Sequence, residues 1–133
     1  MASKNLETVE DVHALLQEMH DNLQQLSGEE GQCLSNNARD HITYLGYHLT
    51  QLSTMIAEIS SLADSRDLSE LLHTVGFEWR GHFTALEGYS MLLLKNAFGP
   101  LTDQQKSILE KFQQKTVAIR VWSEGFIVRR TGS

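Results

Sequence analysis

Cysteine, proline and long hydrophobic runs are scarce in this sequence, and each scarcity excludes a class of protein. Cys33 is the only cysteine, so the chain can form neither an intramolecular disulfide nor a cluster of thiolate metal ligands. One proline and nine glycines leave little room for a loop-rich or all-β fold. The longest wholly apolar run, Met91 to Leu94, is far shorter than the ~20 residues of a membrane-spanning helix. The first residues also lack the apolar stretch of a signal peptide, so we expect a soluble, cytoplasmic protein.

Basic residues are outnumbered by acidic ones. The formal net charge is −6 at pH 7, whereas nonspecific binding to nucleic acid needs a basic surface that displaces counterions. The pair Arg129-Arg130 is too short to act as a basic arm. What is present is 41% hydrophobic and 21% charged residues over 133 positions, the balance of one soluble globular domain. We therefore expect a single domain, 1–133, that binds neither nucleic acid nor a membrane.

Apolar residues recur three and four positions apart in four segments, the spacing of helices that pack along one face. The predicted apolar positions are Val9, Val12, Leu16, Met19, Leu23 and Leu26; then Ile42, Leu45, Leu49, Leu52, Ile56, Ile59 and Ala63; then Leu68, Leu72, Val75, Trp79, His82, Leu86, Tyr89 and Leu93; and finally Gln105, Ile108, Phe112, Lys115, Ile119, Trp122 and Phe126. No segment of useful length alternates as a strand would. The sequence therefore predicts an all-α protein.

Turn and capping residues separate the four segments. The glycines of Ser27–Gly31 end the first helix, and the second runs from about Leu34–Asn37 to about Ala63. The third, from Leu68 to about Ala97, has Asp67 as its predicted N-cap. Gly99-Pro100 then stops that helix, and Thr102 is the predicted N-cap of the fourth.

Short loops between long amphipathic helices favour antiparallel neighbours. We therefore predict an antiparallel bundle of four helices, built from an N-terminal hairpin, 8–63, and a C-terminal hairpin, 67–128.

One stretch of the C-terminal hairpin resembles a known family. Phe77 to Leu94 reads F-E-W-R-G-H-F-T-A-L-E-G-Y-S-M-L-L-L, and K-N-A-F-G-P-L-T-D-Q-Q follows. The string resembles the dimerisation and histidine-phosphotransfer domain of bacterial sensor histidine kinases, whose pattern is roughly H-E-L-R-T-P-L-T-A-I-x-G-Y-x-x-L-L. The matching positions are Glu78, Arg80, Thr84, Ala85, Gly88 and Tyr89. The resemblance covers about half of the chain, and the first two helices have no such signature.

The residues that carry the family's chemistry are replaced. Phe77 stands where the family has its phosphoacceptor histidine, and a benzyl side chain has no nucleophilic nitrogen to form a phosphoramidate. Gly81 stands in place of the side chain that positions water in the phosphatase reaction, and His82 in place of the proline that kinks the helix. No phosphate-binding glycine loop is present. We therefore expect a non-enzyme without a cofactor.

The resemblance implies a regulatory role through protein binding. In the family, a response-regulator receiver domain docks beside the phosphoacceptor, and two hairpins pair into a four-helix bundle. We therefore expect this chain to bind a receiver domain or a histidine kinase. The predicted partner-binding residues are Phe77, Glu78, Arg80, Gly81, His73 and Thr84. Whether the bundle closes within one chain or in a homodimer is left open.

Two alternatives remain beside this hypothesis. His73 lies one turn before Phe77, and a phosphorelay role for it would make the protein a phosphotransferase. A purely structural bundle, an assembly or scaffold subunit, would leave the kinase-like string unused. Metal binding is not expected, because the pairs His13/His20 and His41/His48 are seven residues apart, whereas helical metal sites usually have ligands four apart.

Helix geometry makes three further predictions. A seam through Trp79 and His82 places Phe77 at the outermost position of its helix. His82 is then expected to be buried or half-buried and bonded to a neighbouring helix. Gly76 and Gly81 each cost ~1 kcal/mol relative to alanine inside a helix, which indicates either close approach by another backbone or simple tolerance.

Overall fold

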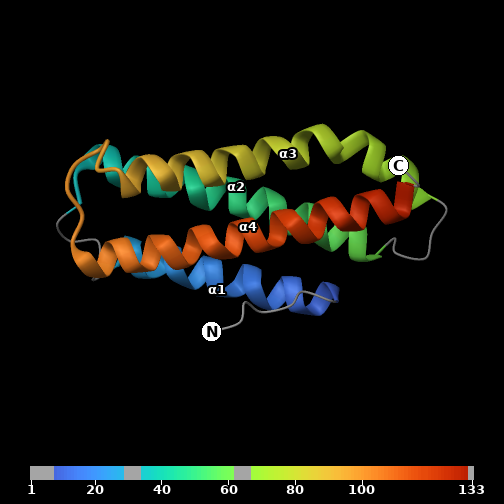
Figure 1. Ribbon diagram of the computed structural model, residues 1–133, viewed down its shortest axis with the longest axis horizontal. Coiled ribbons are helices and arrows are strands. Elements are labelled where there is room, and N and C mark those ends of the chain that lie inside the picture. The colour runs from blue at the N-terminus through green and yellow to red at the C-terminus, as the bar shows by residue number, and fades with distance from the viewer. Residues whose placement is uncertain (1–7, 29–33, 62–66, 132–133) are drawn as a thin grey trace.

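The described residues form four helices, as the apolar periodicity predicts. The computed structural model describes residues 8–28, 34–61 and 67–131; within these ranges the side chains of residues 60, 67–75, 77 and 127–131 lie outside the description. The helices are α1 (Val9–Ser27), α2 (Asn36–Ser61), α3 (Asp67–Leu94) and α4 (Asp103–Thr131) (Figure 1). No strand occurs among the described residues. The all-α antiparallel bundle is therefore confirmed.

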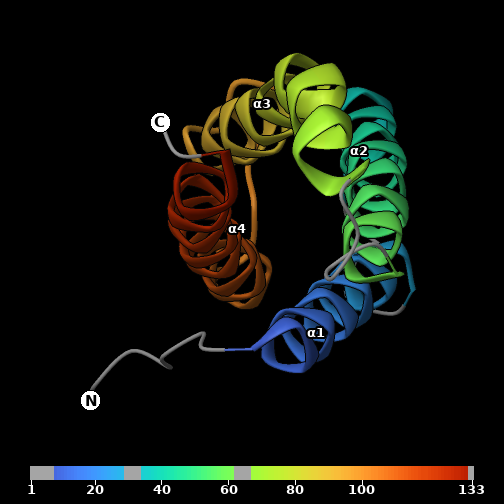
Figure 2. The same cartoon turned by 90° about the vertical axis from the view of Figure 1, so that its right-hand side faces the viewer.

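Each helix packs against two others, and the four surround one core. Consecutive helices run in opposite directions, and α4 returns to pack against α1 (Figures 1 and 2). Lys115 of α4 donates a 3.0 Å hydrogen bond to the Asn22 side chain of α1, and it lies 3.7 Å from the Glu18 carboxylate. The described helices therefore complete a bundle within one chain.

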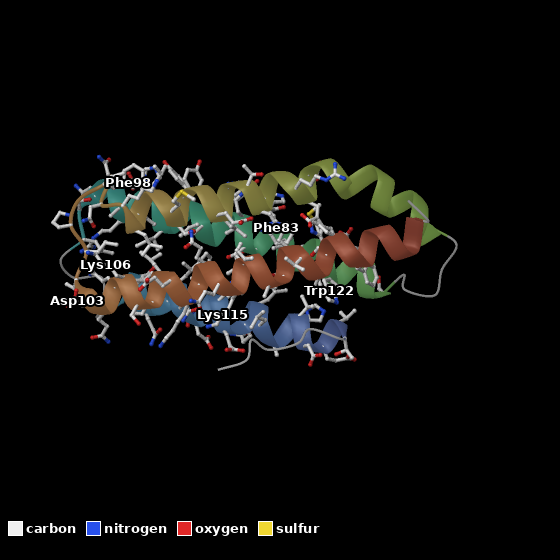
Figure 3. All side chains as sticks on the ribbon, viewed as in Figure 1. Phe83, Phe98, Asp103, Lys106, Lys115 and Trp122 are labelled. Atoms are coloured by element: carbon white, nitrogen blue, oxygen red, sulfur yellow. The ribbon has the colours of Figure 1, made fainter. Side chains whose placement is uncertain are left out.

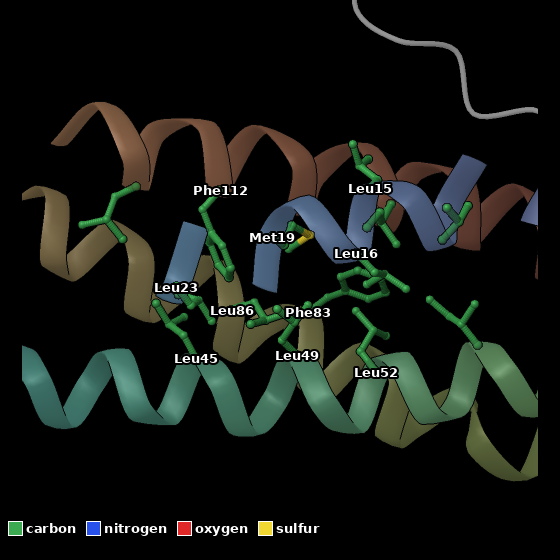
Figure 4. Packing of buried hydrophobic residues seen from close by; sticks show 14 of the residues in the cluster. Leu15, Leu16, Met19, Leu23, Leu45, Leu49, Leu52, Phe83, Leu86 and Phe112 are labelled. Carbon is green, nitrogen blue, oxygen red and sulfur yellow. The ribbon is translucent and has the colours of Figure 1, made fainter. Parts of the chain in front are cut away.

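The core is a single apolar cluster with members from all four helices. Six predicted positions of α2 are all buried: Ile42, Leu45, Leu49, Leu52, Ile56 and Ile59. Met19 of α1, Phe83 of α3 and Phe112 of α4 meet them in the interior (Figure 4). Burying a side chain of this size contributes about 1.5–3 kcal/mol, so this cluster is the main source of stability.

Reciprocal hydrogen bonds begin two helices. The Thr8 hydroxyl accepts from the Asp11 backbone N–H at 3.2 Å, and the Asp11 carboxylate accepts from the Thr8 N–H at 3.1 Å. At the start of α4, Thr102 Oγ1 accepts from the Gln105 N–H at 3.1 Å, and Gln105 Oε1 accepts from the Thr102 N–H at 2.9 Å. Both are capping boxes. The predicted N-cap Thr102 is confirmed, whereas the side chain of Asp67 lies outside the described residues.

The end of α3 corrects the sequence prediction. The helix stops at Leu94 rather than near Ala97, because Asn96 takes a left-handed conformation with φ of 61°. The Ala97 N–H then bonds the Leu92 carbonyl and the Asn96 N–H bonds the Leu93 carbonyl, both at 3.0 Å. These two bonds form a Schellman motif, in which asparagine can replace the usual glycine. Gly99-Pro100 belongs to the loop that follows.

The buried side of α3 also differs from the predicted seam. Trp79, Phe83, Leu86 and Leu93 are buried, whereas His82 and Tyr89 are only half-buried. A helix packed between two neighbours buries a stripe wider than a two-position seam. Phe83 therefore joins the core, and His82 lies at its edge beside α2.

Candidate functional site

The outward surface of α3 contains three of the predicted partner-binding residues. Arg80, Gly81 and Thr84 are exposed and lie three, four and seven residues after Phe77, so they share its side of the helix. The same line continues through Gly88 and Met91, which is 46% exposed. We call Arg80, Gly81, Thr84, Gly88 and Met91 the outer α3 face.

The other predicted residues fall elsewhere. The backbones of Phe77 and His73 belong to α3, but their side chains lie outside the described residues. Glu78 is exposed and lies one turn before His82, on the side of α3 that meets α2. The structure therefore places Arg80, Gly81 and Thr84 on one face and Glu78 on another.

The glycines of α3 meet no crowding within the described chain. A Cβ built on Gly76, Gly81 or Gly88 would meet no atom within 4 Å. No backbone of the described chain therefore requires these positions to be glycine. Of the two interpretations of Gly76 and Gly81, close approach by another part of this chain finds no support.

His82 makes the contact predicted for it, with a partner that the sequence did not identify. Its Nδ1 lies 2.9 Å from Nδ1 of His48 on α2, so one imidazole donates and the other accepts. Burial lowers the pKa of both imidazoles; His82 lowers the pKa of His48 further, and the Glu78 carboxylate partly opposes the lowering at His82. Both shifts favour the neutral form of the rings. No local spacing could have revealed it, because the two residues come from different helices.

A row of rings extends from this pair along the α2–α3 junction. His41 stacks on Phe98 with ring centroids 3.7 Å apart, and its ring lies edge-on to Tyr44 and Tyr89. Tyr44 is 45% exposed. The row joins α2 to α3 and to the loop after α3.

A groove of about 310 Å³ lies between α3 and α4. Its lining residues are Trp79, Arg80, Phe83, Thr84 and Glu87 of α3, with Arg120 and Glu124 of α4. Figure 3 shows Phe83 where α3 passes alongside α4. Arg80 and Thr84 belong both to the groove and to the outer α3 face. Sequence reasoning had not singled out Phe83, Glu87, Arg120 or Glu124 as site residues.

Charge and an unpaired donor distinguish this groove. The Arg120 guanidinium donates to the Glu87 carboxylate at 2.8 Å and to the Glu124 carboxylate at 3.4 Å. The hydrogen bond to Glu87 raises the pKa of Arg120, which therefore keeps its charge. Trp79 is fully buried, and its indole Nε1–H has no hydrogen-bond partner among the described residues.

The described residues contain no group of three or more histidine, cysteine, aspartate or glutamate side chains placed to hold a metal ion. None of the described helices is both long enough and apolar enough to cross a membrane. No protein-family model, curated protein or solved structure matches this chain.

Proposed function

We propose that this protein is a non-catalytic regulatory adaptor of bacterial two-component-type signalling, located in the cytoplasm. It binds the receiver domain of a response regulator through the outer α3 face and the neighbouring position 77. The observation that favours this function is the exposure of Arg80, Gly81 and Thr84 along one side of α3, on the side where the resembling family has its phosphoacceptor.

The arrangement of the helices favours a receiver domain over a histidine kinase. In the resembling family, hairpins pair through their apolar sides. In this chain the apolar side of α3, with Trp79 and Leu86, is already buried within the bundle. A kinase hairpin would have to displace α2 or α4 to reach it. A receiver domain needs only the exposed side of α3.

The replacement at position 77 fits binding without chemistry. A phenylalanine covered by a partner contributes roughly 1.5–3 kcal/mol, which corresponds to about one to two orders of magnitude in affinity. An imidazole in the same place would be needed only for phosphoryl transfer. Compared with the family's histidine, Phe77 therefore lacks the reactive nitrogen and offers more apolar contact area.

Binding to purified receiver domains tests the proposal. With this protein immobilised, biolayer interferometry is expected to detect at least one receiver domain, and Phe77→Asp is expected to weaken its binding at least tenfold. Val121→Asp is the matched control, because it places the same charge at an exposed apolar residue of α4 that is 58% exposed. That variant is expected to bind like the unmodified protein.

Three outcomes would contradict the proposal. The first is full binding by the Phe77→Asp variant, and the second is binding to no receiver domain at all. The third is acid-labile label on this chain after incubation with a radiolabelled phospho-receiver, since that label would indicate phosphotransfer to a histidine such as His73.

A further inference from the structure

We propose that the outer side of α2 binds a basic segment of a protein partner, one that carries arginine or lysine. This proposal does not depend on receiver binding, which uses a different helix. Exposed residues of α2 recur three and four positions apart, so they lie along one side of the helix: Asp40, Tyr44, Tyr47, Gln51, Thr54 and Glu58. We call these six residues the outer α2 face. No other described helix covers this side of α2 (Figure 2).

Two tyrosines of the outer α2 face are exposed and yet held in place by neighbouring rings. Tyr47 is 59% exposed and Tyr44 is 45% exposed. The Tyr44 ring lies edge-on to His41, with centroids 5.1 Å apart, and contacts Tyr89 of α3 at 5.8 Å. The Tyr47 ring lies edge-on to His48 at 5.2 Å. Rings held in this way lose little freedom when a partner covers them, and tyrosine is frequent among the residues that dominate binding energy at interfaces.

The charges along the outer α2 face are all negative. Asp40 and Glu58 lie at its two ends, and neither carboxylate forms an ion pair with a described residue. Glu78, on the side of α3 that meets α2, adds a negative charge nearby. Arg39 precedes Asp40 in the chain but lies beside α1, where it lines a small pocket with Leu26. A partner that covers the outer α2 face therefore meets negative charge together with exposed tyrosine rings.

Tyrosine rings and carboxylates together select a cation. A guanidinium or ammonium group is attracted to the π-face of tyrosine, and arginine also stacks on aromatic rings and can bind a carboxylate through two parallel hydrogen bonds. An acidic partner would be repelled, and two copies of this chain that met through the same face would bring like charges together. The outer α3 face differs in sign, because it contains the exposed Arg80. The two faces therefore suit partners of different charge.

Labelled octa-arginine is a suitable probe, because an extended octapeptide and the helical rise from Asp40 to Glu58 both span about 27 Å. Fluorescence anisotropy is expected to show saturable binding of octa-arginine at micromolar concentration, weaker binding of octa-lysine and no binding of octa-glutamate. The chain has three tyrosines, whose ring resonances can be followed by NMR in the same titration. Octa-arginine is expected to move the ring signals of Tyr44 and Tyr47 and to leave the indole signal of the buried Trp122 in place.

Variants separate the two recognition elements. A protein with both Tyr44→Leu and Tyr47→Leu retains apolar area but loses the π-faces, so its affinity for octa-arginine is expected to fall about tenfold. Asp40→Asn is expected to weaken binding about threefold, because one carboxylate is lost. Glu110→Gln is the matched control, since it removes an exposed carboxylate from α4 and is expected to bind like the unmodified protein. Circular dichroism checks that each variant is folded.

Four results would overturn the proposal. The first is no binding of octa-arginine, and the second is equal binding by the double tyrosine variant. The third is equal weakening by Glu110→Gln and Asp40→Asn, which would indicate attraction to the net charge of the chain alone. The fourth is self-association of the unmodified protein that the double tyrosine variant abolishes, since that result would assign the outer α2 face to a second copy. Receiver binding is measured separately, so none of these results bears on it.

Discussion

The contact between His48 and His82 joins two helices through groups that titrate near neutral pH. One neutral ring donates its Nδ1–H to Nδ1 of the other, at an Nδ1–Nδ1 distance of 2.9 Å. Protonating both rings would place two donors and two positive charges face to face. The groups around the pair are Tyr47 of α2, with Tyr89 and Glu78 of α3, and only Glu78 favours the charged form of His82.

We expect the free energy of unfolding to fall as the pH is lowered from 7.5 to 5. Both histidines have a pKa below the ordinary 6.5 in the folded protein, so below that pH the unfolded chain takes up protons that the folded chain does not. The contribution of this pair to the free energy of unfolding is therefore fully present above pH 6.5 and is lost as the pH falls below it. Urea denaturation across this range measures the change.

The control for this prediction removes one ring of the pair. His48→Gln retains a polar group at the position but cannot become charged, so the decline below pH 6.5 is expected to be smaller than in the unmodified protein. An identical decline in the two proteins would show that the pair is not its source.

At the scale of the helices, Gly88 of α3 is a position where a substitution is expected to stabilise the protein. This residue is exposed in the interior of the helix, and a methyl group there would meet no atom within 4 Å. Gly88→Ala is therefore expected to raise the free energy of unfolding by about 1 kcal/mol, because glycine is the more flexible residue in the unfolded chain. Thermal or urea denaturation followed by circular dichroism measures this gain.

Gly99 provides the opposite case in the loop after α3. Its φ of +117° lies in a region that alanine rarely adopts, and a Cβ would lie 3.4 Å from Ser35 Oγ. Gly99→Ala is expected to lower stability, so the same substitution has opposite signs at the two sites. Equal effects at both would contradict the structural explanation.

The helices also show what the sequence could reveal and what it could not. The apolar period and the capping residues were sufficient to predict α2 and the start of α4, because the buried leucines and Thr102 can be recognised from the local sequence alone. The core of α3 and α4 was harder to predict, because Ser90, Thr116 and Ser123 are buried yet polar. Each satisfies its hydroxyl by donating to a backbone carbonyl of its own helix, which no hydrophobic pattern records.

The candidate site was only partly predictable, for a related reason. Arg80, Gly81 and Thr84 were found from one helix and its resemblance to a family. The groove depends on Glu87 meeting Arg120, 33 residues away, and the imidazole pair depends on His48 meeting His82. Such pairs follow from how helices pack, which a single sequence does not specify.

For the whole molecule, the N-terminal helices cover the apolar side of the C-terminal ones. Without α1 and α2, the core residues of α3 and α4, among them Phe83 and Phe112, would lose the buried residues of those two helices that complete the core. A fragment comprising 67–133 is therefore expected not to persist as a folded monomer but to associate through that side. Analytical ultracentrifugation across a concentration series, together with circular dichroism, tests this. A monomeric fragment that unfolds cooperatively would contradict it.

The bond between Lys115 and Asn22 has a consequence for the order of folding. Three of the four interhelical interfaces join helices that are consecutive in the chain, whereas this bond links residues 93 positions apart and closes α4 on α1. Contacts between neighbours require only short loops to close, so the α1–α4 interface is expected to form last. Lys115→Met leaves the buried Asn22 without its donor and should cost about 1–3 kcal/mol. In stopped-flow experiments that loss is expected to appear as faster unfolding at a nearly unchanged refolding rate, while slower refolding would place the closing interface in the folding nucleus.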